Sequence, residues 1–193
     1  MATAGRLTHL LVVDVEATCD DAGRLPKTEM EMLEIGAVMT KWTDFTVVGE
    51  LAAFVRPVRH PRLTAFCRQL TSITQRQVDD APGFPEVASA LKKWIYGFED
   101  VSWCSWGDYD RAQLALDCDR HHVTNPMPHR HINLKARYSA ANGLSKKLGM
   151  AQALKHAALP LVGTHHRGID DARNLARLLP HAFGATSSGP VDR

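Results

Sequence analysis

Three short segments of the sequence contain most of the residue types that could perform acid–base or metal chemistry. They contain six carboxylates, four of which are candidate ligands, and a histidine, and each segment lies beside a recognisable structural signal. Carboxylates that a fold brings together repel one another unless a shared proton or a divalent cation offsets their charge. Such a set therefore favours the chemistry of a metal-dependent hydrolase. The segments are DVEATC (residues 14–19), WGDYD (residues 106–110) and HRGIDDA (residues 166–172).

The first segment ends an apolar run, residues 9–16, that is typical of a buried strand. Residues two apart on a strand share a face, so Asp14 and Glu16 are expected to point the same way. Two adjacent carboxylates at the end of a core strand are costly without a partner. Hydrated acids at a strand edge would give the same Asp-x-Glu pattern, so the pair alone is weak evidence for a metal site.

The third segment is predicted to be a loop followed by a helix. Gly163 and Gly168 bracket the loop, and His166 lies on it. Asp171 falls in the first helical turn, where the helix dipole favours negative charge. Asp170 competes with it for a ligand role, and dipole stabilisation alone explains an acid in a first turn. The apolar residues that recur with helical spacing are Ile169, Ala172, Ala176 and Leu179.

Taken together, the motifs resemble those of the DEDDh 3′–5′ exonucleases of the RNase H-like superfamily. The most similar branch contains the histone-mRNA and RNA-interference exoribonucleases and the bacterial KapD-type proteins. The ordered set runs from about residue 10 to residue 179 and is much more specific than an Asp-x-Glu pair. The matching motifs are DVEATC, EIGAV (34–38), FVRP (54–57), LTAFCRQLTSITQRQV (63–78), WGDYD and HRGIDDARNLARL (166–178).

The resemblance implies that Asp14 and Glu16 are the first two metal ligands. The family's second aspartate opens a helix and is followed four positions later by a large apolar residue. Asp110, with Leu114 four residues on, fits that pattern better than Asp108. We expect Asp108 to cap the helix that starts near residue 109.

The family's last motif pairs a histidine with an aspartate five positions later, which selects His166 and Asp171 over His165 and Asp170. The resemblance implies two Mg²⁺ or Mn²⁺ ions on the four carboxylates, because hard cations prefer oxygen ligands. It also implies that His166 is the general base, a role suited to a side chain that titrates near neutrality. No position of the family's catalytic set is missing.

Contacts with the substrate are expected from Glu16, Thr18, Phe66, Tyr109 and His166. Thr18 follows the first motif and is placed near the terminal sugar by the resemblance. Phe66 lies in the segment where related enzymes hold the terminal nucleotide, and Tyr109 precedes a proposed ligand. Stacking on a base contributes about 1–3 kcal/mol and tolerates any base. Packing in the core is an equally good interpretation of both rings.

The net charge is only +2, but the acids are unevenly distributed. Residues 51–78 and 120–169 contain no Asp or Glu. This segregation favours basic surfaces beside an acidic metal site, suited to a phosphate backbone. Charge scattered over several faces for solubility is the alternative. The basic residues of the two segments are Arg56, Arg59, Arg62, Arg68, Arg76, Arg120, Arg130, Lys135, Arg137, Lys146, Lys147, Lys155 and Arg167.

The length of 193 residues and the apolar content of 45% predict a single domain over residues 8–183, with flexible tails at residues 1–7 and 184–193. No apolar run of about 18 residues or secretory leader is found, so a cytoplasmic protein without a membrane span is expected. The four cysteines have no paired spacing, which favours reduced thiols.

The order of elements predicts an α/β domain with a mixed five-stranded sheet flanked by helices, as in the RNase H-like fold. Trp103 and Trp106 are expected in its core. Strands are predicted over residues 10–16, 32–40, 46–56, 101–106 and 131–134. Helices are predicted over residues 74–78, 135–148, 150–158 and 169–181, in a stripe from residue 84 to residue 95, and after residue 109.

The function expected from these features is a 3′–5′ exoribonuclease that acts on single-stranded RNA 3′ ends or short overhangs and releases nucleoside 5′-monophosphates. One alternative is a DNA exonuclease of the proofreading type. Another is a non-catalytic RNA-binding module on the same fold. A protein partner or a homodimer would assist binding to long RNA, although no motif points to either.

Overall fold

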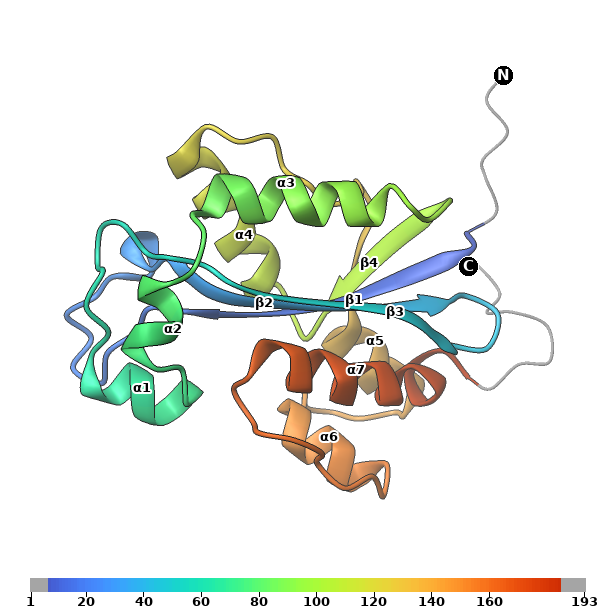
Figure 1. Cartoon of the computed structure of the whole chain (residues 1–193). Helices are drawn as coiled ribbons and strands as arrows, with labels where there is room; N and C mark the ends of the chain where they lie inside the picture. Colours follow the sequence, from blue (N-terminus) through green and yellow to red (C-terminus); the bar gives the residue numbers. More distant parts are fainter. Residues whose placement is uncertain (1–6, 185–193) are drawn as a thin grey trace.

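The computed structural model describes residues 7–184 of the chain (Figure 1). The expected tails, residues 1–7 and 184–193, lie outside these residues except for Leu7 and Gly184. No helix of the described part is long and apolar enough to cross a membrane. All four cysteines are free thiols.

One mixed sheet forms the centre of the fold, in the order β3-β2-β1-β4-β5. The strand β1 (His9–Ala17) pairs antiparallel with β2 (Met32–Lys41), which pairs antiparallel with β3 (Val47–Phe54). On its other side, β1 runs parallel to β4 (Val101–Ser105), and β4 runs parallel to β5 (His131–Asn133). The prediction of a mixed five-stranded sheet is therefore confirmed.

Helices cover both faces of the sheet (Figure 1). On one face lie α3 and α4, on the other lie α5, α6 and α7, and the short helices α1 and α2 lie at one end of the sheet. The bounds are α1 (Ala65–Thr71), α2 (Gln75–Asp79), α3 (Phe84–Ile95), α4 (Tyr109–His121), α5 (Leu134–Ala141), α6 (Met150–His156) and α7 (Gly168–Phe183), with a 3₁₀ turn η1 (Lys27–Glu29).

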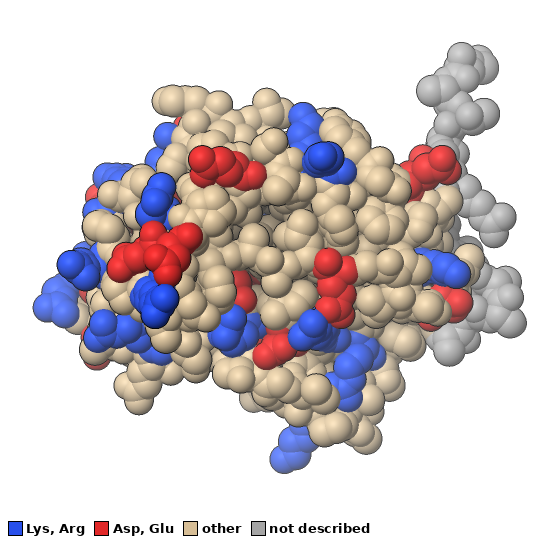
Figure 2. All heavy atoms as spheres, viewed as in Figure 1, with Lys and Arg blue, Asp and Glu red and all other residues tan. Residues whose placement is uncertain are grey.

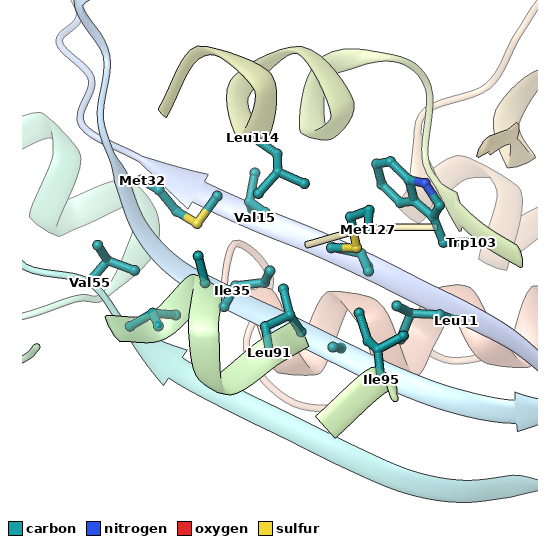
Figure 3. Packing of buried hydrophobic residues seen from close by; sticks show 14 of the residues in the cluster. Leu11, Val15, Met32, Ile35, Val55, Leu91, Ile95, Trp103, Leu114 and Met127 are labelled. Carbon is teal, nitrogen blue, oxygen red and sulfur yellow. The ribbon is translucent and has the colours of Figure 1, made fainter. Parts of the chain in front are cut away.

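The alternation of side chains along β1 divides the apolar residues between two cores. Odd-numbered residues from Leu11 to Val15 pack with Trp103 and Leu114 beneath α3 and α4 (Figure 3). The apolar residues at positions 10 and 12 pack with α5, α6 and α7 on the opposite face. Because the period of a strand is two, Asp14 and the next even position continue the series that faces α7.

Two helices of the structure differ from the prediction. The helix α1 was not predicted, although Thr64 caps it by accepting the Cys67 N–H. The helix predicted over residues 135–148 ends at Ala141. It ends there because Gly143 adopts a left-handed φ of 62°, which terminates a helix at little cost for glycine.

Candidate active site

A cleft of about 450 Å³ opens beside the carboxyl ends of β1 and β4. These two parallel strands are neighbours, and the chain continues from β1 to β2 and from β4 to β5, toward opposite edges of the sheet, an arrangement that commonly leaves a ligand-binding crevice. Four buried or half-buried acids and two histidines line the cleft. They are Asp14, Glu16, Asp110, Asp171, His165 and His166.

Asp14 and Glu16 come from β1 and lie on the face that α7 covers. One oxygen from each lies within 4.8 Å of the other and of an oxygen of Asp171. Burial, followed by the negative charge of Asp110, raises the pKa of Asp14 well above its ordinary value. Burial and the nearby Asp171 raise the pKa of Glu16 to about 8. The two carboxyl groups therefore occupy a region that disfavours their ionised forms.

Asp110 lies in the first turn of α4 and is only 5% exposed. Its Oδ1 accepts the backbone N–H of Val15 at 3.0 Å, which fixes the start of α4 against β1. Burial raises its pKa to about 6, although this hydrogen bond opposes the shift. Asp108 precedes the helix as predicted, but its side chain caps no N–H group. It binds the side chains of Arg111 and Asn133 instead.

A contact between two glycines places Asp171 beside Asp14. Gly36 is the cross-strand partner of Asp14, and Gly168 is the first residue of α7. A Cβ atom on Gly36 would lie 2.1 Å from the carbonyl carbon of Gly168. The start of α7 can therefore approach the sheet this closely only because residue 36 has no side chain.

A buried ion pair holds the loop that precedes α7. Glu34 is 2% exposed, and its carboxylate accepts from the Nε of Arg167 at 3.0 Å and from its Nη2 at 3.1 Å. The N–H of Gly168 also donates to Glu34, at 3.0 Å. Arg167 was among the residues considered for phosphate binding, but its guanidinium is committed to this bidentate pair.

The two histidines of the loop lie against Asp171. The His165 Nδ1 is 2.9 Å from Oδ2 of Asp171, and the His166 N–H donates to the same oxygen at 3.0 Å. The His166 Nδ1 is 3.9 Å from Oε1 of Glu16. Burial and the neighbouring His165 lower the pKa of His166, while burial raises the pKa of Asp171. His166 was predicted at this site, whereas for His165 simple exposure to solvent was preferred over a supporting contact beside His166.

Aromatic side chains form part of the cleft wall. Tyr109 is 44% exposed, lines the cleft and directs its hydroxyl to the Met30 Sδ at 3.9 Å. Trp106 also lines the cleft, and its Nε1 donates to the Leu148 carbonyl. Trp106 thus packs against the core as expected while one side of it borders the cleft, and Trp103 is buried as expected.

The other two expected substrate contacts lie beside the cleft. Thr18 is 4% exposed, and its hydroxyl accepts the Glu31 N–H at 2.9 Å. Phe66 is half-buried on α1, where Leu70, one turn further along the helix, lines the cleft. No local sequence signal marked Leu70, because it lies far from the motif acids in the chain.

The basic residues are only partly available for phosphate. On the face drawn in Figure 2, positive and negative side chains are interspersed over most of the surface. Arg59, Arg76 and Arg120 form ion pairs with acids of the chain. Among the described residues that line the cleft, Lys27 is the only Lys or Arg.

The model of the RNase T exonuclease family matches residues 11–179. The chain belongs to this family. Mouse ERI1 exoribonuclease 3 is 32% identical over 184 residues, which cover 90% of this chain and 53% of the mouse protein. The chain thus spans about half the length of that relative.

Solved exonuclease structures share the fold. The nuclease domain of 3′hExo, a DEDDh family member bound to rAMP, superposes with a TM-score of 0.82 at 26% identity, with 90% of each chain covered. A 3′-exonuclease structure described as recognising the 3′ end of the histone mRNA stem-loop gives a TM-score of 0.79 at 25% identity, covering 90% of this chain and 80% of that one. The predicted RNase H-like fold and the resemblance to the histone-mRNA branch are confirmed.

Proposed function

We propose that this protein is a divalent-metal-dependent 3′–5′ exoribonuclease. It removes nucleotides from single-stranded RNA 3′ ends or short overhangs and releases nucleoside 5′-monophosphates. The observation that carries the proposal is the cluster of four acids beside His166, in a chain of the RNase T exonuclease family. Relatives described as exoribonucleases, and a related structure bound to rAMP, support RNA as the substrate.

The donor set fits hard divalent cations. Asp14, Glu16, Asp110 and Asp171 would be the ligands of two Mg²⁺ or Mn²⁺ ions, because these cations prefer carboxylate oxygens. Burial and then the repulsion of neighbouring acids raise the pKa values of Asp14 and Glu16, and bound cations would oppose both effects. When bound, two such ions supply water activation and charge stabilisation for phosphodiester hydrolysis.

His166 is the proposed general base. Its lowered pKa keeps the imidazole neutral at physiological pH, so the ring can accept the proton of the attacking water. Its left-handed backbone, with φ of 63°, and the hydrogen bond from its N–H to Asp171 hold it at the cleft. The imidazole is 40% exposed, so solvent can carry the proton away.

The proposed contacts with the terminal nucleotide surround these acids. Tyr109 presents an exposed ring for base stacking, and Lys27 offers a positive charge to a phosphate. Thr18 and Phe66 are kept as proposed contacts of the terminal sugar and base because α1 and the end of β1 border the cleft. Glu16 and His166 complete the set.

A degradation assay tests the proposal. Matched 5′-labelled single-stranded RNA and DNA oligonucleotides are incubated with the protein and Mg²⁺, Mn²⁺ or EDTA. We expect a metal-dependent ladder that shortens from the 3′ end, with RNA degraded faster than DNA. Thin-layer chromatography of uniformly labelled RNA should reveal nucleoside 5′-monophosphates as the product.

Each of the other outcomes would support a different function for this protein. Faster degradation of DNA would support the proofreading-type exonuclease instead. Intact RNA and DNA under every metal condition, together with measurable RNA binding, would replace the proposal with a non-catalytic RNA-binding module. A 3′-labelled oligonucleotide that loses its label at the first turnover would distinguish exonuclease from endonuclease cleavage.

A further inference from the structure

His165 makes two separate contacts at the candidate active site. Its Nδ1 lies 2.9 Å from Oδ2 and 3.1 Å from Oδ1 of Asp171. Its ring also stacks on the ring of His166, with centroids 4.0 Å apart and planes inclined by 21°. One side chain therefore contacts both a proposed metal ligand and the proposed general base.

The hydrogen bonds determine how the Asp171 carboxylate is turned. An ionised carboxylate only accepts hydrogen bonds, so the His165 Nδ1 is the donor. With the His166 N–H at 3.0 Å, Oδ2 of Asp171 receives two N–H groups from the loop. An oxygen of the same carboxylate also lies within 4.8 Å of oxygens of Asp14 and Glu16. The loop thus holds Asp171 from one side while the group faces the acid cluster on another.

The stacking contact limits the movement of His166. The backbone of His166 is in the left-handed region, which costs energy for a residue other than glycine and persists only where its surroundings enforce it. The side chains of both histidines are 40% exposed, so neither ring is fully enclosed by the protein. The His165 ring, itself anchored on Asp171, supplies a fixed surface against which the His166 ring lies.

We propose that His165 is a positioning residue that orients the Asp171 carboxylate for metal binding and the His166 imidazole for proton transfer. This inference rests on the proposed function of the same site. Groups that hydrogen-bond to metal ligands set the orientation of those ligands, and their loss typically weakens metal binding about 10–100-fold. If His165 had no such role, its replacement would alter neither metal affinity nor turnover.

Three variants separate the two contacts. His165→Ala removes both. His165→Asn keeps an N–H donor near the position of Nδ1 but removes the ring, and His165→Phe keeps a stacking ring but removes the donor. His129→Ala, at an exposed histidine outside the cleft, is the matched control.

Metal affinity is measured by calorimetric titration of each metal-free protein with Mn²⁺, a readout that does not depend on activity. We expect His165→Ala and His165→Phe to bind Mn²⁺ about 10–100-fold more weakly than wild type. His165→Asn should recover most of the affinity. Melting curves of the metal-free variants establish that each one is folded.

Turnover of labelled RNA at saturating Mn²⁺ reports on the second contact. The kcat of His165→Ala should fall about tenfold with a nearly unchanged KM, because a displaced base lowers turnover without weakening substrate binding. His165→Phe should retain more turnover than His165→Ala under these conditions, because its ring still supports His166. His129→Ala should match wild type in both measurements.

Equal Mn²⁺ affinity and equal kcat in wild type and His165→Ala would overturn the inference. So would a loss in His165→Asn as large as that in His165→Ala for both quantities, because loop disruption alone would then explain it. Failure of the proposed function has a different signature, namely a wild-type protein that neither binds Mn²⁺ nor shortens RNA.

Discussion

The protein buries two groups of acids that differ in how far arginines and backbone N–H groups offset their charge. The first, the cleft acids, comprises Asp14, Glu16, Asp110 and Asp171. The second, the paired acids, comprises Glu31, Glu34 and Asp117, which are at most 2% exposed. Among residues 7–184, no ion pair with Lys or Arg involves a cleft acid, whereas Glu34 and Asp117 each pair with an arginine.

The paired acids are satisfied by the chain itself. Glu31 accepts three consecutive backbone N–H groups, which start at Val58, at 2.7–3.0 Å. Asp117 binds the side chains of Gln113 and Arg120 and the Met32 N–H. These acids therefore organise loops and strand ends, and they need no further ligand.

The cleft acids are brought together without equivalent compensation. Burial raises the pKa of Asp14, and the mutual repulsion of the group adds to that effect. If these positions were purely structural, amide or apolar side chains there would make the fold more stable than carboxylates do. The difference between the groups teaches that burial of an acid does not by itself indicate function, whereas burial of several acids together without a Lys or Arg partner does.

Exchange of one cleft acid for an amide should produce the largest effect. We expect Asp110→Asn to lower turnover about 10³-fold or more, because the proposed metal site loses a negatively charged ligand. Asp108→Asn is the matched control, since this exposed neighbour binds only Arg111 and Asn133. Rates from the 5′-labelled RNA assay should be within about twofold of wild type for the control. Similar rates for both variants would remove the distinction.

Loss of the general base should have the next largest effect. His166→Ala is expected to lower turnover about 10²-fold, because proton transfer from the attacking water loses its acceptor. Mn²⁺ affinity and RNA binding should stay close to wild type, as measured by calorimetry and filter binding. Turnover near the wild-type rate would exclude His166 as the base.

A change to a paired acid should affect stability. Glu34→Gln is expected to lower the free energy of unfolding by about 2 kcal/mol, because Arg167 and the Gly168 N–H lose a charged acceptor. Glu50→Gln is the control, since its ion pair with Arg173 is exposed and contributes at most about 1 kcal/mol. Urea unfolding gives both values, and equal losses would contradict the contrast.

A pH dependence of stability is expected in the metal-free protein alone. Because the pKa of Glu16 is raised to about 8, the folded state retains a proton that the unfolded chain releases above its ordinary pKa of 4.5. The folded state therefore loses stability as pH rises from about 5 to 8. Melting temperatures should fall over this range in EDTA, fall less in Glu16→Gln and stay level with Mg²⁺. A flat wild-type curve in EDTA would oppose this account.

Much of the sheet could be predicted from local patterns. The period of two along β1 placed Asp14 and Glu16 on one face, and the helical spacing after residue 168 placed Asp171 in the first turn of α7. The seven-residue helix α1 was missed because its apolar pattern is too short to stand out. The helix α5 was predicted too long because apolar residues recur beyond Gly143, where the backbone turns.

The contacts that hold the site could not be read from the chain. Glu34 and Arg167 are 133 positions apart, and nothing local in the sequence links them. The close approach of Gly36 and Gly168 likewise requires the fold. The contact of His165 with Asp171 was not predicted, because its spacing matches no motif and only the loop geometry brings its ring to that carboxylate.

The most direct test of the account is anomalous diffraction from crystals of the protein soaked in Mn²⁺. If the cleft acids are partnered by metal, two anomalous peaks should appear among Asp14, Glu16, Asp110 and Asp171, and no peak should appear at Glu31, Glu34 or Asp117. Crystals of Asp110→Asn should lose at least one of the peaks. A cleft without anomalous signal at saturating Mn²⁺, or peaks only at the paired acids, would contradict the central claim.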